Sequence, residues 1–449
     1  MKIEDVQMKD FKAHFVHVGN MNNKGTQALL KSDVATIHEV VDGNVIASVS
    51  TTDIEGVRKL NLSLEAIIPS AVDIPYEKTD QMAKQFGFDR NGIKYKAFAV
   101  GMLFYVFVQT LFSVFSVLAI KVGFKPLYRP EVFDQIRQSD LVISHSDESF
   151  KETASLLPLN LYWILTWWSM LWSRTFEVLV ALSFHKPVVL FPNSVGPFRT
   201  GVGEYLSKLT LRNCRRLLIR DPISFEIVKS MGINVPKVLT YDTAILFNPK
   251  QKRVTVDCIR PILGISPGMY SHSLSREGVE NFIDAHAEAL DYAVAKYGFS
   301  VIFLPHYISG FQHDDLEICR LIANKMNKKD SGRIIEANSV EEFKLLLNEM
   351  DMVISSKMHP AILAVTGFVP VLCIAYDHKQ TAFFERLGMS KVILDIGSIN
   401  SSELIQKIDY VWNNRGKLET ILSEQIPLWQ KDVKESIKQA IAPFVSKLG

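Results

Sequence analysis

The chain has 449 residues, and its 50 lysines and arginines nearly balance its 48 aspartates and glutamates, for a formal net charge of +2. This length is too great for one compact core and favours two domains. The charge balance gives no global case for binding nucleic acid, so any anion recognition must be local. Four scattered cysteines without metal-binding spacing predict reduced, buried thiols, and the N-terminus lacks a secretory pattern, so we expect a cytoplasmic protein.

The first half of the chain alternates short apolar strands with polar turns and helices. Ala13 to Val18 predicts a strand, which breaks into the Gly/Asn-rich segment Gly19 to Thr26 and then a helix. This segment has the outline of a phosphate-binding loop but lacks GxGxxG and GxxxxGK[ST], and an ordinary βα turn explains it equally well. The other strands predicted here lie at or near Asn44–Val49, Leu60–Ile68, Asp140–Ser146, Val188–Pro192, Leu217–Arg220 and Val238–Asp242.

One apolar segment, Ala97 to Ile120, contains no charged residue and meets the length criterion of about 20 residues for a membrane-spanning helix. A single crossing would place strands of one predicted sheet on opposite sides of the membrane, which is physically excluded if that sheet forms. Basic residues flank both ends and give no orientation signal. Besides a true span, three interpretations stay open: a helix lying in the membrane interface, a re-entrant hairpin, and a buried helix covering the sheet.

The second half repeats the alternation after a polar, irregular segment, Asn248 to Asp257, where we place the domain boundary. We expect an N-terminal domain over 1–248 with the apolar insertion at 97–120, and a C-terminal donor-binding domain over 258–400. Charged amphipathic helices over 401–449 are free to pack back on the first domain. Alternation in both halves predicts an α/β protein with two doubly wound, Rossmann-like parallel sheets facing each other across a cleft.

The segment from Asp351 to Tyr376 predicts a complete β-α-β unit. An apolar strand runs into the polar turn Ser355 to His359, a helix of small and apolar residues reaches Gly367, and Pro370 opens a second strand. In open α/β sheets ligands bind where strands end and helices begin, because helix N-termini present unpaired N–H groups and a partial positive charge. Lys357 and His359 on this turn do not serve packing, so we interpret them as binding a small anion.

Other polar residues also fall at predicted strand ends, and two sheets whose carboxyl edges face each other would bring them together. The candidate site residues are Asn20, Gly25, Asp147, Asn193, Arg220, Asp221, His272, His306, Ser356, Lys357, His359, Asp377 and Lys379. A lone histidine is more often structural, and Arg220–Asp221 is equally well a structural ion pair. No metal site is expected, although His313, Asp314 and Asp315 permit one, and the absence of GxSxG leaves serine hydrolase chemistry unsupported.

Six short motifs follow one another in a recognisable order. They are the xGxxALL segment (Asn23–Leu30), DxVIxxSD (Asp140–Asp147), NSVGP (Asn193–Pro197), RDxxS (Arg220–Ser224), YDTA (Tyr241–Ala244) and a basic-x-His-x-x-x-x-Ala turn followed by IxYDxK (Lys357–Lys379). Together they resemble the polysaccharide pyruvyl transferase family over nearly the full chain. The resemblance implies a GT-B-like fold, phosphoenolpyruvate as donor substrate with no cofactor, a glycan acceptor, and a pyruvate ketal product with release of phosphate.

The resemblance also implies roles for the candidate residues. Arg220, Lys357 and His359 would supply cations for the donor, His359 or His306 the acid, and Asp221 or Asp147 the base. The family turn usually reads Arg-x-His, and Lys357 stands in place of that arginine, which keeps the charge but loses bidentate pairing.

Two other functions stay open from the sequence: a nucleotide-sugar-dependent glycosyltransferase on the same fold, and a non-catalytic, membrane-associated scaffold of glycan assembly. The apolar segment adds the expectation of a peripheral contact with the inner face of the membrane.

Overall fold

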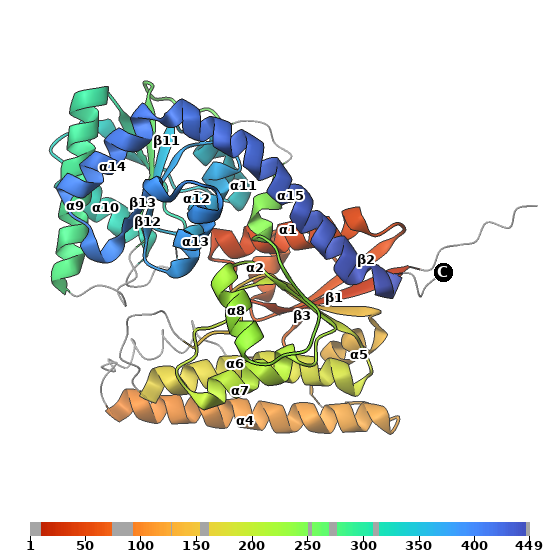
Figure 1. Cartoon of the computed structure of the whole chain (residues 1–449). Coiled ribbons are helices and arrows are strands. Elements are labelled where there is room, and N and C mark those ends of the chain that lie inside the picture. The colour runs from red at the N-terminus through yellow and green to blue at the C-terminus, as the bar shows by residue number, and fades with distance from the viewer. Residues whose placement is uncertain are drawn as a thin grey trace, which may run out of the picture.

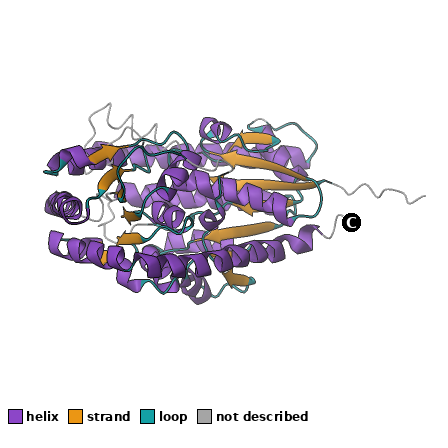
Figure 2. Cartoon of the chain, turned by 90° about the horizontal axis from the view of Figure 1, so that it is seen from above, coloured by secondary structure: helices purple, strands orange, loops and turns teal. Residues whose placement is uncertain are grey.

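Two parallel β-sheets with helices on both sides form the body of the protein (Figures 1 and 2). The computed structural model describes residues 10–73, 93–126, 128–152, 161–249, 254–268, 276–308 and 314–445. Within these residues the first sheet has seven strands in the order β3-β2-β1-β4-β5-β6-β7. They are β1 (Phe11–Val18), β2 (Val45–Thr51), β3 (Ala66–Pro69), β4 (Leu141–Ser144), β5 (Val188–Asn193), β6 (Arg216–Ile219) and β7 (Lys237–Leu239).

The second sheet, again counted within the described residues, has six strands in the order β10-β9-β8-β11-β12-β13. They are β8 (Ile262–Ser266), β9 (Ser300–Phe303), β10 (Gly332–Ile334), β11 (Met352–Ser355), β12 (Val371–Ala375) and β13 (Ile393–Asp395). All strand pairs of both sheets are parallel, as the alternation of strands and helices predicts. Their carboxyl ends point to the boundary between the two domains.

Side-chain caps set the start of many helices. Asn23, Asp53, Thr200, Asp221 and Asp377 each accept a hydrogen bond from a backbone N–H of the first turn that follows, which the helix itself leaves unpaired. The helices of the first half are α1 (Lys24–Val40), α2 (Ile54–Lys59), α4 (Ile93–Lys121), α5 (Pro130–Gln138), α6 (Leu161–Ser183), α7 (Gly201–Leu211), α8 (Pro222–Ser230) and the 3-10 turn η1 (Thr243–Leu246). Those of the second half are α9 (Arg276–Tyr297), α10 (Asp315–Lys325), α11 (Val340–Asn348), α12 (Met358–Val365), α13 (His378–Arg386), α14 (Ser401–Asn413) and α15 (Arg415–Val445).

The last helix, α15, runs from the second domain back across the first (Figure 1). The Trp429 ring stacks on Tyr241 with a centroid distance of 4.0 Å, and the Gln430 amide donates to the Ile245 carbonyl at 2.7 Å. One buried apolar cluster extends from β1 and α1 through η1 into the second sheet and α15. This shared core fixes how the two sheets face each other.

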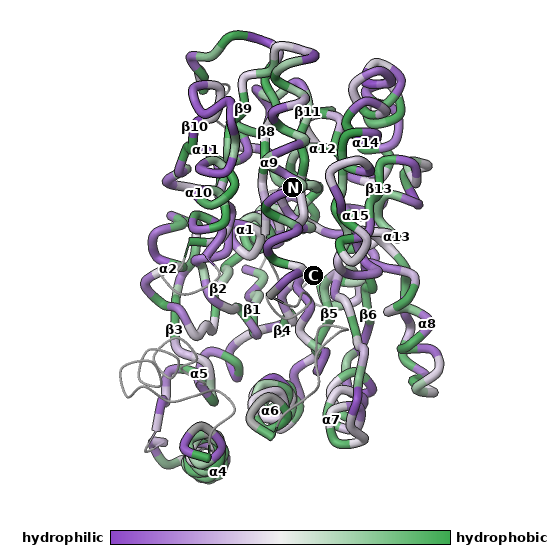
Figure 3. The backbone as a smooth tube through the Cα atoms, turned by 90° about the vertical axis from the view of Figure 1, so that its left-hand side faces the viewer, coloured by the Kyte–Doolittle hydropathy of each residue, from purple (hydrophilic) through white to green (hydrophobic). Residues whose placement is uncertain are grey.

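The apolar segment forms one unbroken helix, α4, which packs mainly on α6 at the outer side of the first domain (Figures 1 and 3). β3 precedes it and β4 follows it in the same sheet, so a single membrane crossing is excluded. The re-entrant hairpin is wrong because the helix has no break, and the buried helix is wrong because one of its faces is exposed. Among the described residues, α4 alone has the length and composition of a membrane-spanning helix.

Candidate active site

A small cavity of about 60 Å³ lies where the carboxyl ends of the two sheets meet. Residues of both domains line it: Asn23, Asp147, Glu148 and Arg220 from the first, and His306, Lys357, Met358, His359, Tyr376, Asp377, Lys379 and Gln380 from the second. Seven of the residues predicted from separate strand ends therefore line one cavity: Asp147, Arg220, His306, Lys357, His359, Asp377 and Lys379.

The turn after β11 places Lys357 at the start of α12. Its Nζ lies 2.6 Å from Oδ1 of Asp315, whose side chain is fully buried, and its alkyl chain crosses Gly268 so closely that a Cβ there would collide with it. The second carboxylate oxygen of Asp315 accepts the Tyr307 N–H at 2.8 Å. Asp315 thus joins the loop after β9 to the turn after β11. The side chain of Lys357, the N-cap residue of α12, makes no capping hydrogen bond, so the N-terminus of this helix is suited to an anion.

His306 and His359 line the cavity as a parallel pair with ring centroids 6.2 Å apart. His306 is 2% exposed, and within the described residues neither of its ring nitrogens has a hydrogen-bond partner. Burial holds the pKa of His306 well below its ordinary value, and the positive charges of Lys357 and Lys24 lower it further. Burial also lowers the pKa of His359, although the Asp242 carboxylate opposes this. Both imidazoles are therefore neutral near pH 7.

The start of α1 enters this site from the first domain. Gly25 lies against His359 so closely that a Cβ would overlap the imidazole ring. Lys24 Nζ lies 3.5 Å from the His306 carbonyl oxygen, and burial lowers the pKa of Lys24 although the Asp315 carboxylate opposes this. Asn23 pairs with Tyr307 through an isolated antiparallel bridge. The glycine of the xGxxALL motif is thus required for close contact between the two domains.

Arg220 follows β6 and is held by groups of the first domain. Its Nη1 lies 2.6 Å from Oδ2 of Asp242, and its Nε donates to Ser194 Oγ at 2.8 Å. Burial opposes the charge of Arg220, but Asp242 and neighbouring carboxylates hold its pKa above the ordinary value. The structural ion pair considered between Arg220 and Asp221 is therefore wrong, because Arg220 pairs with Asp242. Asp221 instead caps α8, accepting the Ser224 N–H at 2.8 Å and the hydroxyls of Ser194 and Ser224 at 2.7 Å.

An ion pair between Lys379 and Glu148 closes the cavity across the two domains. Burial opposes the charge of Lys379, but Glu148 and Asp377 hold the pKa of its ammonium above the ordinary value. Burial tends to raise the pKa of Glu148, but the charges of Lys151 and Lys379 outweigh this effect and hold the pKa well below its ordinary value. The Glu148 carboxylate is therefore ionised. Asp377 caps α13 by accepting the Lys379 N–H at 3.2 Å. The Glu148 side chain is 31% exposed and that of Lys379 is 6% exposed, so Glu148 is the more exposed partner of the bridge.

Three other predicted residues do not line the cavity and instead make hydrogen bonds in loops at the ends of strands. Ser356 Oγ accepts the Gly268 N–H at 2.7 Å, which ties the turn after β11 to the loop after β8. Asn193 donates to the His145 carbonyl and accepts from the Ser149 N–H, both at 2.9 Å. Asn20 accepts the Asn22 N–H at 2.7 Å within the loop before α1. His272, the remaining candidate, lies outside the described residues.

Asn23, Lys24, Glu148 and Asp315 also belong to this site, although they are not among the candidate residues predicted from the sequence. Asn23 and Lys24 belong to the xGxxALL segment, so the motif itself could have indicated them. Glu148 follows the DxVIxxSD motif directly and carries a similar signal. Asp315 stands in a different loop from Lys357, and only the packing of β9 beside β8 and β11 brings them together.

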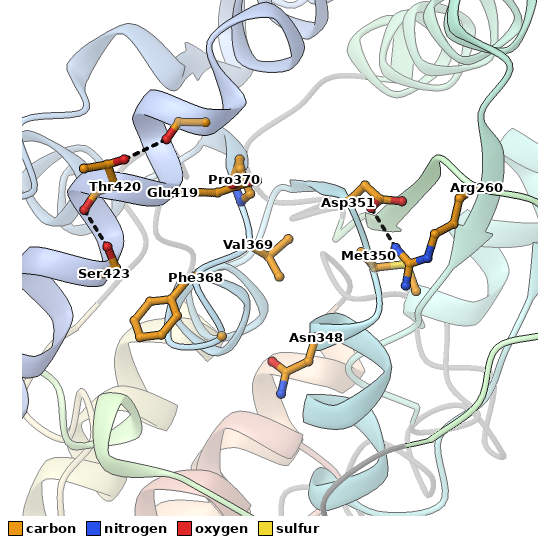
Figure 4. A pocket seen from close by; sticks show the side chains of 12 residues that line it. Arg260, Asn348, Met350, Asp351, Phe368, Val369, Pro370, Glu419, Thr420 and Ser423 are labelled. Atoms are coloured by element: carbon orange, nitrogen blue, oxygen red, sulfur yellow. Dashed lines mark hydrogen bonds and ion pairs between the residues drawn. The ribbon is translucent and has the colours of Figure 1, made fainter.

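The alternatives to this cavity within the described residues would be a metal-binding group or another pocket. Among the described residues, no group of three or more His, Cys, Asp and Glu side chains could hold a metal ion. A larger hollow of about 510 Å³ lies near the amino ends of β8, β11 and β12, where Arg260 pairs with Asp351 at 2.7 Å (Figure 4). Ligands of open α/β sheets bind at the opposite, carboxyl edge. The interdomain cavity is therefore the candidate active site.

A family model for polysaccharide pyruvyl transferases matches residues 59–378, which is most of the chain. The protein belongs to the polysaccharide pyruvyl transferase family. This confirms the resemblance drawn from the six motifs and makes the protein a transferase of polysaccharide modification. This pyruvyl transferase family member is 23% identical over 313 residues to the amylovoran biosynthesis protein AmsJ of Erwinia amylovora, an alignment that covers 66% of this chain and 70% of AmsJ.

Solved structures show where the fold of this pyruvyl transferase family member recurs. The UDP-GlcNAc 2-epimerase of Neisseria meningitidis superposes with a TM-score of 0.54 at 11% identity, covering 97% of this chain and 100% of the epimerase. The UDP-GlcNAc 2-epimerase of Methanocaldococcus jannaschii gives a TM-score of 0.52 at 13% identity, covering 89% of this chain and 92% of the epimerase. At such identities the likeness shows the fold alone, and it confirms the predicted GT-B-like arrangement.

Proposed function

We propose that the protein transfers the pyruvyl group of phosphoenolpyruvate to two hydroxyls of a glycan, forming a cyclic ketal and releasing phosphate. Family membership supports the reaction class. We choose this donor because Arg220, Lys357 and Lys379 line the same cavity as two buried, neutral histidines. Phosphoenolpyruvate carries its carboxylate and phosphate on one carbon, so both anions need cations within one small site.

The donor would bind between the turn after β11 and the loop after β6. Lys357 and the N-terminus of α12 face one anionic group, and Arg220 and Lys379 face the other. A cavity of about 60 Å³ has room for only a few waters at about 10–15 Å³ each, so the donor needs more room. We propose that donor phosphate replaces the partly exposed Glu148 carboxylate at Lys379, which opens the cavity and keeps the charge balanced.

The reaction balances without any further reactant. A proton adds to the methylene carbon of the enol, and a first sugar hydroxyl attacks the neighbouring carbon while a base removes the hydroxyl proton. The second hydroxyl then replaces the phosphate at the same carbon, so two C–O bonds form and the bond to phosphate breaks. The two hydroxyls together lose two hydrogens. One of them accounts for the hydrogen gained by the new methyl group, and the other leaves with phosphate.

Two histidines and one aspartate are placed for these proton transfers. We assign the acid to His359, with His306 beside it, because both imidazoles line the cavity and neither Nε2 has a hydrogen-bond partner in the part of the chain that the structure describes. We assign the base to Asp147, which lines the same cavity from the other domain. Asp221 was an equal candidate, but its carboxylate accepts three hydrogen bonds within its own loop and helix, so we give it a positioning role.

Donor binding is expected to take up protons at neutral pH. The free histidines have lowered pKa values, and an anion beside them favours the protonated form, so binding raises these pKa values toward neutrality. The donor complex therefore binds more protons than the free protein, and donor affinity rises as pH falls from 8 to 6. Calorimetry of phosphoenolpyruvate binding in buffers of different ionisation enthalpy measures this uptake. His306→Gln should reduce it, whereas uptake unchanged in both His306→Gln and His359→Gln would contradict the assignment.

Released phosphate is the test of the proposed function. The protein is incubated with phosphoenolpyruvate and a panel of glycans, and in parallel with a UDP-sugar and the same glycans. Phosphate release that requires both phosphoenolpyruvate and a glycan supports the proposal. Nucleotide release with transfer of sugar would establish a glycosyltransferase instead, and binding without turnover of either donor would establish the scaffold.

We place the reaction in the cytoplasm, at the inner face of the membrane, with a lipid-linked glycan as acceptor. What supports this location is the exposed apolar face of α4, which a protein working free in solution would not need.

A further inference from the structure

Helix α4 exposes large apolar side chains, whereas its inward face combines buried apolar residues with uncharged polar ones. Three of these polar side chains point inward: Gln109, Ser113 and Ser116 are 4%, 0% and 1% exposed. Gln109 exchanges two hydrogen bonds with the backbone of Asp73, at 2.8 and 3.0 Å. Ser113 donates to the Ala71 carbonyl, and Ser116 to the Tyr128 carbonyl. These bonds fix the rotation of α4 about its axis.

Large apolar side chains occupy the outward face of α4. Six of them, 41% to 66% exposed, follow one another at helical spacing: Val100, Phe104, Phe107, Leu111, Phe115 and Leu118. Surface helices of soluble proteins carry polar residues on this face, and a contiguous apolar surface of this kind marks an interaction site. Figure 3, which views α4 end-on, shows it at the outer boundary of the first domain, on the side away from the second sheet.

The charges around this face select its partner. Lys94 and Lys96 lie near one end of α4, Lys121 and Lys125 near the other, and all four are exposed. The chain from 93 to 126 contains no aspartate or glutamate. A second copy docked by a two-fold axis would bring lysines against lysines, which is unfavourable. Anionic lipid headgroups complement both lysine pairs, while the apolar side chains between them reach the acyl chains.

We propose that α4 lies flat in the interface of an anionic bilayer and anchors the first domain to it, with its lysines at the level of the headgroups. The membrane location is part of the proposed function, and the flat orientation of α4 makes it specific. The orientation does not depend on the chemistry of the cavity. The fixed inward face prevents α4 from leaving the domain to cross the bilayer. The second domain then faces away from the membrane (Figure 1).

Flotation with vesicles tests the contact. We expect the full-length protein to float with vesicles of phosphatidylcholine and phosphatidylglycerol, and much less with phosphatidylcholine alone. The triple variant Phe104→Ser/Phe107→Ser/Phe115→Ser should lose at least tenfold in apparent affinity while keeping its thermal midpoint and its phosphate release with a water-soluble acceptor. Ile259→Ser/Leu428→Ser, which removes apolar side chains 81% and 60% exposed elsewhere, is the matched control and should float like the wild type.

Depth measurements separate a flat helix from the other arrangements. Nitroxide labels on Val100→Cys, Phe107→Cys and Phe115→Cys should show equal, shallow depth by oxygen and nickel accessibility. A deep central label with shallow ends would indicate a span and overturn the inference. It would also be overturned by flotation of the triple variant equal to wild type, by no flotation of either, or by a lipid-free dimer that the triple substitution dissociates.

Discussion

Lys357→Ala is expected to lower pyruvyl transfer by at least about 100-fold, because a cation facing the donor anion in a dry site is lost. The same change is expected to lower the free energy of unfolding by about 3–5 kcal/mol, because the fully buried Asp315 carboxylate loses its ion-pair partner. Steady-state kinetics of phosphate release and urea denaturation measure the two effects. A loss of activity alone would therefore not separate donor binding from misfolding.

Lys357→Met combined with Asp315→Asn separates the two effects. The pair is replaced by uncharged groups of similar size, and the asparagine oxygen can still accept the Tyr307 N–H that Asp315 accepts at 2.8 Å. We expect stability near that of the wild type but no recovery of activity. Lys357→Arg, which restores the family's usual turn, should keep activity. Wild-type kcat/KM in the double variant would contradict a role for Lys357 in donor binding.

Gly25→Ala is expected to lower kcat by about 100-fold, because an added Cβ would displace the His359 imidazole and misplaced catalytic groups cost this much. Donor KM should change less, since Lys357 and Arg220 stay in place. Alanine is by itself favourable in a helix by about 0.5–1 kcal/mol over glycine, so α1 need not unfold. Kinetics at saturating donor, together with the thermal midpoint, provide the measurement.

Gly416→Ala is the matched control for this substitution. It also adds a methyl group to the first turn of a helix, but nothing lies within 4 Å of the added Cβ. It should leave kcat and KM unchanged. If Gly25→Ala retains the kcat of the wild type, His359 is not the acid whose position limits the reaction.

The architecture was predictable from the sequence because the patterns that indicate strands and helices involve residues close together in the chain. The β-α-β unit from Asp351 to Tyr376 forms as expected, with β11 and β12 flanking α12. Only the end of the strand expected over Leu60–Ile68 forms, as β3. Leu60 and Asn61 instead end α2, and Asn61 adopts a φ of 50°. The short strand β13 was not predicted.

Site residues were predictable as strand ends, but their partners were not. Asp147, Arg220 and Lys357 follow β4, β6 and β11, and parallel strands deliver their ends to one edge. Which carboxylate pairs with which cation depends on packing between loops distant in sequence, as for Lys357 with Asp315 and Lys379 with Glu148. Hydropathy likewise found α4 but could not show that its serines point inward.

Pyruvyl transfer in D₂O tests the central claim most directly. The protein is incubated with ¹³C-labelled phosphoenolpyruvate and a glycan that yields phosphate release, and the glycan is examined by NMR. We expect a ketal methyl group on the glycan that carries one solvent deuterium, with one phosphate released per ketal, because the acid adds a proton to the methylene carbon. A glycan that gains no ketal, or a transferred group that keeps its methylene carbon without deuterium, would contradict it.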